Sequence, residues 1–409
     1  MTTAAIALAR CAELAAISTS PTHLERTYLT PEHAAANRLV AGWMADAGMR
    51  TWVDAAGNQW GRAEGAVPGL PALVLGSHLD TVPDAGRFDG MLGVVLGIAV
   101  AQRLRGTPLP LAVEVVGFSD EEGARFGTAL LGSRAVAGTW EPHWAQLRDA
   151  AGFSLDHALA DFGLDADRIG DAARAPGDLV GYLEAHIEQG PVLESADRSL
   201  GVVTAIAGAR RFALSILGEA RHAGGTPYDR RRDALVGAAE VILAVERLGR
   251  AGECIATVGQ IAVTPGAVNV VPGRADLSLD LRAATDAERD RMWDVVQAEI
   301  DAICARRGLS ATTVETHRAP AAPCAPWLQQ AVAAGIAATD DTGAAEPLGL
   351  WSRAGHDAMA MAAVTDIGML FLRCADGISH SPEEAVREID VARGLDALEA
   401  TVRAVAARR

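Results

Sequence analysis

The fold is decided by three successive stretches: LVLGSHLD at residues 73–80, MLGVVLGIAVAQRLR at 91–105 and LAVEVVGF at 111–118. The first stretch begins with the short apolar run Leu73 to Leu75, which ends at Gly76-Ser77, and the third is an apolar run rich in Val. Both are typical of strands, and the second stretch has the length and residues of a buried helix. Strand, helix and strand, with a polar loop after each strand, indicate a mostly parallel α/β sheet. In such sheets, chemistry gathers in the loops beyond the carboxyl ends of the strands.

A second unit is expected over residues 211–319, inserted into a catalytic domain made of residues 1–210 and 320–409. The sequence predicts strands at 212–217, 254–263, 275–281 and 310–315, and helices at 233–248 and 286–307. This βαββαβ order resembles the ferredoxin-like split motif. The first domain then resumes with a helix predicted at 357–363 and a strand at 367–372.

Composition narrows the class of protein. The 409 residues suffice for two domains, and the formal charge is −16 with no lysine in the chain. An acidic chain of this kind argues against nucleic acid or an anionic membrane as partner. The five cysteines are scattered and form no CxxC pair, which fits a reducing compartment. The N-terminus predicts an amphipathic helix rather than a signal peptide, and the longest apolar run is too short to span a bilayer, so we expect a cytoplasmic protein.

Five polar segments carry histidines and carboxylates next to apolar strands. They are GSHLD at 76–80, RFDG at 87–90, DEEG at 120–123, EAHIEQG at 184–190 and GISHSPE at 377–383. Each segment alone could be an ordinary solvated turn, because Asp and Glu are mostly exposed. Together they offer imidazole and carboxylate ligands, which suit Zn²⁺, Mn²⁺ or Co²⁺. A pair of such ions about 3.5–4 Å apart needs a bridging carboxylate and lowers the pKa of a shared water towards 7.

The sequence resembles a known family at this point. The strings that carry the resemblance are GSHLDTVPDAGRFDG, SDEEGARFG, EAHIEQGPVLE, HAGGTPYDRRRDAL, NVVPG, AGHDAMAM and GISHSPEE. They look like those of the N-carbamoyl-amino-acid hydrolase and allantoate amidohydrolase family, within the larger group of dinuclear exopeptidases and aminoacylases. The resemblance runs from Thr27 nearly to the end of the chain.

The resemblance implies a centre of two divalent ions, Zn, Mn or Co, held by five side chains. The ligands would be His78 and His186 for one ion, Glu122 and His380 for the other, and Asp89 between them. Asp80 would accept the second ring N–H of His78 and fix its tautomer. Glu121 would be the general base, which takes a proton from the water and passes it to the departing nitrogen.

Substrate contacts are expected mainly from the inserted domain. Arg282 resembles the arginine that grips the substrate carboxylate. His222 resembles a histidine that stabilises the oxyanion and often reaches in from the partner subunit, so we expect a homodimer formed through the inserted domain, which would also act as a lid. The remaining contacts implied are Asn269, Arg211, Gln189 and His356. Arg211 follows Arg210, and such paired arginines can equally face only water.

The resemblance favours hydrolysis of the ureido C–N bond of a small acid, with release of ammonia and carbon dioxide. Both allantoate and N-carbamoyl-L-amino acids fit, and the string GMLFLRC at 368–374 slightly favours allantoate, although Arg373 and Cys374 could be only a strand end. Arg353 stands where the family commonly has a small residue, which leaves the size of the substrate open. An aminoacylase or dipeptidase on the same scaffold is the alternative. A metal-binding protein without activity is disfavoured, because such a protein needs no Glu121 beside its ligands.

Overall fold

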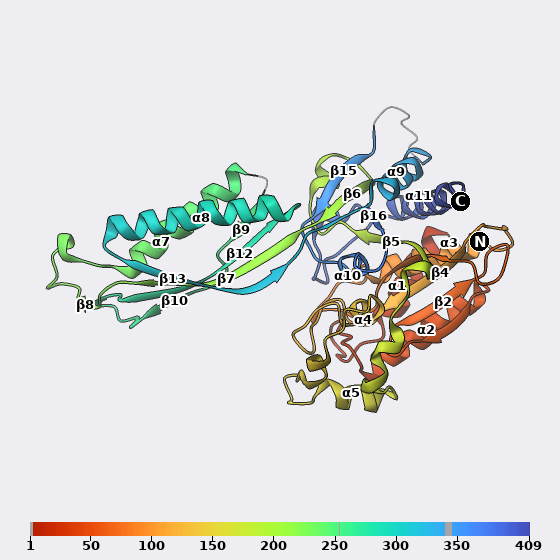
Figure 1. Ribbon diagram of the computed structural model, residues 1–409, viewed down its shortest axis with the longest axis horizontal. Helices are drawn as coiled ribbons and strands as arrows, with labels where there is room; N and C mark the ends of the chain where they lie inside the picture. Colours follow the sequence, from red (N-terminus) through yellow and green to blue (C-terminus); the bar gives the residue numbers. More distant parts are fainter. Residues whose placement is uncertain (1–2, 253, 340–345) are drawn as a thin grey trace. The chain divides into compact units, whose positions relative to one another are not determined.

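The computed structural model describes residues 3–252, 254–339 and 346–409 (Figure 1). The chain divides into two compact units. Unit 1 comprises Met1–Thr204 and Cys324–Arg409, and unit 2 comprises Ala205–Pro323. The predicted boundaries, at residues 211 and 319, both lie a few residues inside unit 2.

Unit 1 is built on a mixed sheet whose strands follow the order β1-β2-β4-β3-β5-β16-β6-β14, with β15 also paired to β6. The strands are β1 (Arg50–Val53), β2 (Gln59–Ala63), β3 (Ala72–His78), β4 (Ala112–Phe118), β5 (Leu179–Ile187), β6 (Leu200–Ile206), β15 (Leu348–Ser352) and β16 (Ile367–Leu372). The four central strands, β4, β3, β5 and β16, are parallel. β1, β2 and β6 pair antiparallel to their neighbours. The predicted parallel sheet is therefore its centre, and antiparallel strands flank it.

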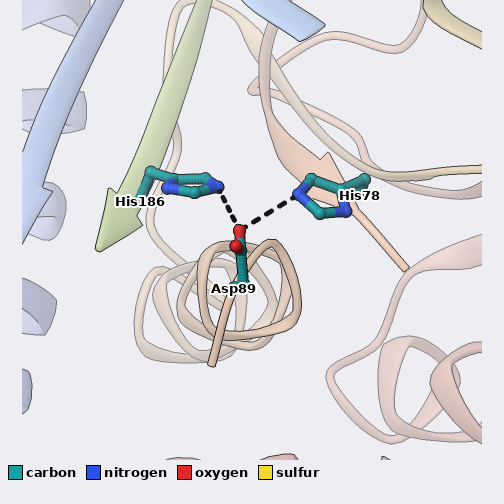
Figure 2. A group of neighbouring side chains, drawn as sticks. All are labelled: His78, Asp89 and His186. Atoms are coloured by element: carbon teal, nitrogen blue, oxygen red, sulfur yellow. Dashed lines mark ion pairs between the residues drawn. The ribbon is translucent and has the colours of Figure 1, made fainter. Parts of the chain in front are cut away.

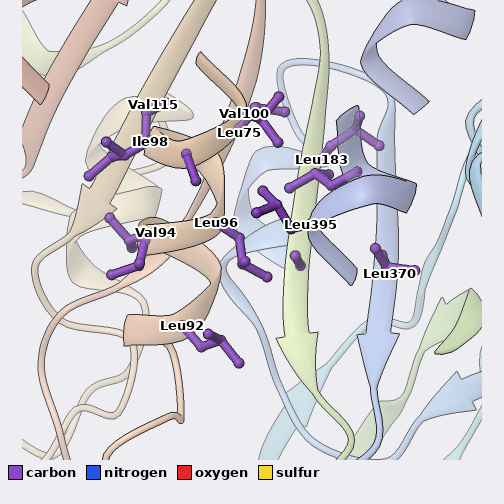
Figure 3. Packing of buried hydrophobic residues seen from close by; sticks show 14 of the residues in the cluster. Leu75, Leu92, Val94, Leu96, Ile98, Val100, Val115, Leu183, Leu370 and Leu395 are labelled. Carbon is purple, nitrogen blue, oxygen red and sulfur yellow. The ribbon is translucent and has the colours of Figure 1, made fainter. Parts of the chain in front are cut away.

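Helix α3 (Met91–Arg103) is the centre of the core of unit 1 (Figure 3). Its residues from Met91 to Ala101 are all buried, because one side packs on β3, β4 and β5 and the other on helices α1 and α11. A helix covered on both sides has no need of a polar face, which explains its uniformly apolar sequence. This packing fixes the start of α3, and the loop before it, beside the carboxyl ends of the central strands.

The other helices of unit 1 cover both faces of the sheet. They are α1 (Ala4–Ala15), α2 (Pro31–Asp46), α4 (Leu131–Val136), α5 (Leu155–Phe162), α6 (Val192–Ser195), α9 (Pro326–Ala337), α10 (Asp357–Met361) and α11 (Glu388–Ala406). α1, α2, α9 and α11 share the core of α3, whereas α4 and α5 belong to a separate apolar cluster around Tyr28 and Phe126. Among the described residues, none of the helices combines the length and the apolar character that a bilayer crossing needs.

Unit 2 is an antiparallel sheet in the order β10-β12-β7-β13, with two helices packed on it (Figure 1). Its elements are β7 (Gly208–Leu217), β8 (Arg221–His222), α7 (Ala234–Ala251), β9 (Ile255–Thr257), β10 (Ile261–Thr264), β11 (Val270–Val271), β12 (Arg274–Ala283), α8 (Asp286–Arg307), β13 (Ser310–Ala319) and β14 (Ala322–Pro323). The single strand predicted over 254–263 is two strands, β9 and β10, which pair with opposite ends of β12. Because the strand is interrupted between them, β9 and β10 pair with β12 in two different registers.

Candidate metal centre

The carboxyl ends of the four parallel strands bring the predicted ligands together. His78 is the last residue of β3, and His186 is the last but one of β5. Glu122 lies in the loop after β4, and His380 lies in the segment after β16. Asp89 precedes α3, whose packing on β3 and β5 places it between the two histidines. Residues scattered from position 78 to position 380 thus meet at one edge of the sheet.

Asp89 lies between the imidazoles of His78 and His186 (Figure 2). Its Oδ1 is 3.4 Å from Nε2 of His78 and 3.1 Å from Nε2 of His186. All three side chains are buried. Burial acts to raise the pKa of Asp89, but the histidines around it outweigh this and hold the pKa well below its ordinary value.

The other oxygen of Asp89 faces a second group. Its Oδ2 is 3.2 Å from Nε2 of His380, and the same nitrogen is 3.3 Å from Oε1 of Glu122. His380 has a φ of 57°, in the left-handed region that side chains other than glycine rarely adopt. Such a conformation costs free energy and is typical of functional sites. Asp89 therefore belongs to two sets of potential ligands, one on each of its oxygens.

The donor atoms fit divalent cations. Oδ1 of Asp89 and Nε2 of His186 are buried, yet neither makes a hydrogen bond within residues 3–252, 254–339 and 346–409. Buried polar atoms are nearly always satisfied, so these two atoms indicate a partner of another kind. Ligands bound at about 2.1 Å in tetrahedral geometry lie about 3.4 Å apart. The distances of 3.1–3.4 Å between these groups match that spacing.

Both buried imidazoles present the nitrogen that a metal would need. Nδ1 of His78 is 3.1 Å from the carbonyl oxygen of Asp80, and Nδ1 of His186 is 2.9 Å from that of Ile187. A carbonyl oxygen only accepts hydrogen bonds, so each Nδ1 carries the proton. The lone pair of each Nε2 is then directed at Asp89. Metal-binding histidines are commonly held in this tautomer by a hydrogen bond from the other ring nitrogen.

The side chain of Asp80 has a different principal contact from the one expected. Its carboxylate lies 3.5 Å from Nδ1 of His78, whereas its own backbone carbonyl is nearer that nitrogen. The carboxylate instead accepts the backbone N–H groups of Glu121 and Glu122, at 2.9 and 3.1 Å. Asp80 therefore holds the acidic loop after β4 in place beside His78.

Glu121, predicted to be the general base and not a ligand, lies next to two of the predicted ligands. One of its carboxylate oxygens lies within 4.8 Å of ligand atoms of His78 and Glu122. Burial raises the pKa of Glu121 well above its ordinary value, and Glu122 adds to the effect. Burial likewise raises the pKa of Glu122 to about 7. Buried carboxyl groups in such number need nearby positive charge to stay ionised, and bound cations would add to what the histidines supply.

Ser379 and Glu384 are contacts that sequence reasoning missed. Oε1 of Glu384 accepts the N–H groups of Phe88 and Asp89, at 2.6 and 3.1 Å. Ser379 donates to Oδ2 of Asp89 at 2.6 Å, and so does Gln189, at 2.9 Å. Gln189, predicted as a substrate contact, thus bonds to a candidate ligand. Glu384 stands in the quoted string GISHSPEE, but nothing in the string shows which of its carboxylates faces inward.

His356, also predicted to contact substrate, is buried against His186. The ring centroids are 4.5 Å apart at 65°, and Nε2 of His356 is 2.7 Å from Oγ of Ser352. Gly355 borders the candidate base, because a Cβ added there would lie 3.7 Å from Oε1 of Glu121. Arg353 is exposed on this same segment, with its guanidinium 5.5 Å from the ring centroid of Trp351. The segment 352–356 therefore borders the candidate centre.

In unit 2, Arg211 and Arg282 share one carboxylate. Nε of Arg211 is 3.1 Å from Oδ2 of Asp280, and Nε of Arg282 is 3.1 Å from Oδ1. Strand register explains the grouping, since Asp280 is directly opposite Arg211 and two residues before Arg282 on β12. Arg210, in contrast, is buried and bound to Glu315 and Asp290. The structure thus places Arg211 with Arg282.

His222 and Asn269 form a separate group. β8 and β11 pair His222 with Val270, the residue after Asn269, and the N–H of Ala223 donates to the carbonyl of Asn269 at 2.8 Å. The N–H of Gly225 donates to Nδ1 of His222 at 3.0 Å. The neutral ring of His222 therefore carries its proton on Nε2, which is an exposed donor.

Residues 74–404 match Peptidase family M20/M25/M40. The chain belongs to this family. Among M20 relatives it is 41% identical to the N-carbamoyl-L-amino acid amidohydrolase of Geobacillus stearothermophilus over 96% of both chains. It is 40% identical to the allantoate deiminase of Arabidopsis thaliana, covering 96% of this chain and 81% of the relative.

Solved structures are also similar to this chain along nearly its whole length. A hydantoinase/carbamoylase family amidase from Burkholderia multivorans superposes with a TM-score of 0.89 at 32% identity, covering 98% of both chains. The family resemblance inferred from the motifs is confirmed, and the chain is a hydrolase. Relatives of both substrate types are almost equally similar to it, so identity does not choose between them.

Proposed function

We propose that this M20 hydrolase cleaves the ureido C–N bond of a small ureido acid, either allantoate or an N-carbamoyl-L-amino acid. The observation that carries the proposal is Asp89, whose two oxygens face His78 and His186 on one side and His380 on the other, with Glu121 alongside. Relatives named for both substrates, at 40–41% identity, support the ureido class over other amides.

In this proposal His78, His186 and Asp89 would hold one divalent ion, and Asp89, Glu122 and His380 would hold the second. When bound, such ions would lower the pKa of a coordinated water and polarise a carbonyl oxygen. Glu121 takes the proton of the attacking water and delivers it to the departing nitrogen, for which a carboxyl group of raised pKa is suited. The carbamate released decomposes to ammonia and carbon dioxide.

The substrate acid group is assigned to Arg282, with Arg211 beside it. Both guanidinium groups are held close together because both bind Asp280. The carboxylate of the substrate would therefore meet two neighbouring cations. His222 donates from Nε2 to the carbonyl oxygen as negative charge develops there. Arg373, in the string at 368–374, is buried and bound to Asp390 and Asp197. It therefore gives no support for allantoate as the substrate.

The placement of His222 supports a homodimer. β8 and β11 adjoin the end of the unit 2 sheet at which β12 begins with Arg274. Arg282 lies eight residues further along this strand, about 26 Å at 3.3 Å per residue. One small substrate cannot reach both groups on a single copy of unit 2. If both bind it, His222 comes from a second chain, as we propose.

A small substrate panel tests the proposed function. Purified protein loaded with Mn²⁺ or Zn²⁺ is assayed for ammonia release from allantoate, N-carbamoyl-alanine and 3-ureidopropionate, and for free amino acid from an N-acetyl amino acid. We expect ammonia from allantoate or N-carbamoyl-alanine and no turnover of the acetyl compound. Hydrolysis of the acetyl compound alone would establish the alternative, an aminoacylase, and refute the proposal.

A further inference from the structure

Glu184 is a buried carboxylate that the proposed mechanism does not use. It lies two residues before His186 on β5, so the two side chains point to the same face of the sheet. Leu183, Ala185 and Ile187 point to the opposite face, into the core that surrounds α3. Glu184 is fully buried, and one of its oxygens lies within 4.8 Å of ring nitrogens of His186 and His356.

Each oxygen of Glu184 is bonded to a different element. Oε1 accepts the hydroxyl hydrogen of Ser77 at 2.8 Å, and Ser77 directly precedes His78 at the end of β3. Oε2 accepts the backbone N–H of Ala358 at 3.0 Å, in the first turn of α10. His356, the residue before that helix, has its ring against His186. One side chain on β5 therefore connects β3 and α10.

We propose that Glu184 is a positioning residue for the metal centre: it sets the relation between His78, His186 and His356 by bonding to Ser77 and Ala358. The inference rests on the proposed two-ion centre and goes beyond it, since Glu184 is outside the ligand set. Its role follows from the two contacts, which join the ends of β3 and β5 to the start of α10 and so hold the three imidazoles in a fixed relation.

Metal binding by Glu184→Gln tests the role without any substrate. The amide has nearly the same shape, but it has one acceptor instead of two and no charge, so one of the two contacts becomes a donor facing a donor. Apoprotein is titrated with Mn²⁺ and with Zn²⁺, and the thermal midpoint of the apoprotein is measured in parallel. We expect one binding event to weaken about 10–100-fold, as for other groups that orient metal ligands.

Glu114→Gln is the matched control. Glu114 is also a buried glutamate of the main sheet, on β4, but it is bound to Arg62 and Arg174. Its replacement should lower the thermal midpoint and leave both metal dissociation constants unchanged. Equal metal affinity in Glu184→Gln and the wild type, or the same loss in both variants, would overturn the inference.

A second variant covers the case in which Glu184→Gln does not fold. Ser77→Ala removes the contact with Oε1 and retains the charge, so it should weaken the same binding event several-fold. No change in Ser77→Ala would count against the role of Glu184. If the wild-type protein itself binds no metal, the proposed function fails first, and the two failures are thereby distinguished.

Discussion

Two adjacent glutamates, Glu121 and Glu122, are assigned different duties, and their backbones are held by one carboxylate, that of Asp80. Glu121→Gln should lower kcat by about 10²–10⁴-fold, because the amide cannot accept the proton of the attacking water. Metal content, measured by atomic absorption, should stay at the wild-type value. Glu122→Gln is the paired control and should lose metal. Full turnover in Glu121→Gln would show that the base lies elsewhere.

His33 makes stability depend on pH. It is buried, stacked on Phe162 with centroids 4.8 Å apart, and its Nδ1 accepts the N–H of Leu29 at 3.1 Å. Burial lowers the pKa of His33 to about 4. The unfolded chain binds this proton near pH 6.5, so stability is lost as pH falls from about 6.5 to about 4, by up to about 3 kcal/mol.

His33→Asn tests this dependence, since Asn can accept the N–H of Leu29 and does not titrate. Free energies of unfolding from urea titrations at pH 7.5, 6, 5 and 4 are compared between the variant and the wild type. The variant should be the less stable protein at pH 7.5, and the difference should shrink as the solution becomes acidic. A difference that is constant with pH would contradict the assignment.

At the scale of elements, α3 lies so close to β5 that only glycine fits at position 93. A Cβ there would be 2.1 Å from the carbonyl oxygen of Ala185 and 2.9 Å from Cβ of Ser77. Gly93→Ala must push α3 away from the sheet and displace Asp89, at a cost of about 1–3 kcal/mol or more. Metal affinity should fall along with the thermal midpoint.

Gly42→Ala is the control for helix propensity. Gly42 lies in α2, and an added Cβ there would meet nothing within 4 Å. This substitution should raise stability by about 0.5–1 kcal/mol. Chemical unfolding of the two variants separates the effects, and stabilisation by both would show that α3 can move freely.

The elements also show how far the sequence alone could go. The apolar runs of β3, α3 and β4 predict their structures because no face of them is exposed, and the strand predicted at 367–372 coincides with β16. β5 was not predicted as a strand, since Glu184 and His186 interrupt its apolar pattern. Those polar residues are buried because a neighbouring strand and helix satisfy them, a tertiary effect that no local pattern contains. The alternation of Tyr182, Glu184 and His186 was the available signal.

For the whole molecule, a mixing experiment tests the homodimer. Glu121→Gln and His222→Ala proteins, each inactive, are mixed and allowed to exchange subunits. If His222 serves the partner's centre, half of the dimers carry one intact centre, and activity should return to about a quarter of the wild-type value. Each variant mixed with itself is the control. No recovery, with subunit exchange verified by mass spectrometry, would place His222 in its own chain's centre.

β16 lies between β5 and β6 in the sheet, although it is the last of these strands along the chain. A ribosome must therefore translate past residue 372 before the gap in the sheet can close, and past residue 380 before the final histidine emerges. Any shorter nascent chain exposes β5 along one edge and lacks His380, a proposed ligand. Metal loading at the proposed centre therefore has to follow translation past residue 380, and chains terminated before it should be proteolysed rather than accumulate as partial enzymes.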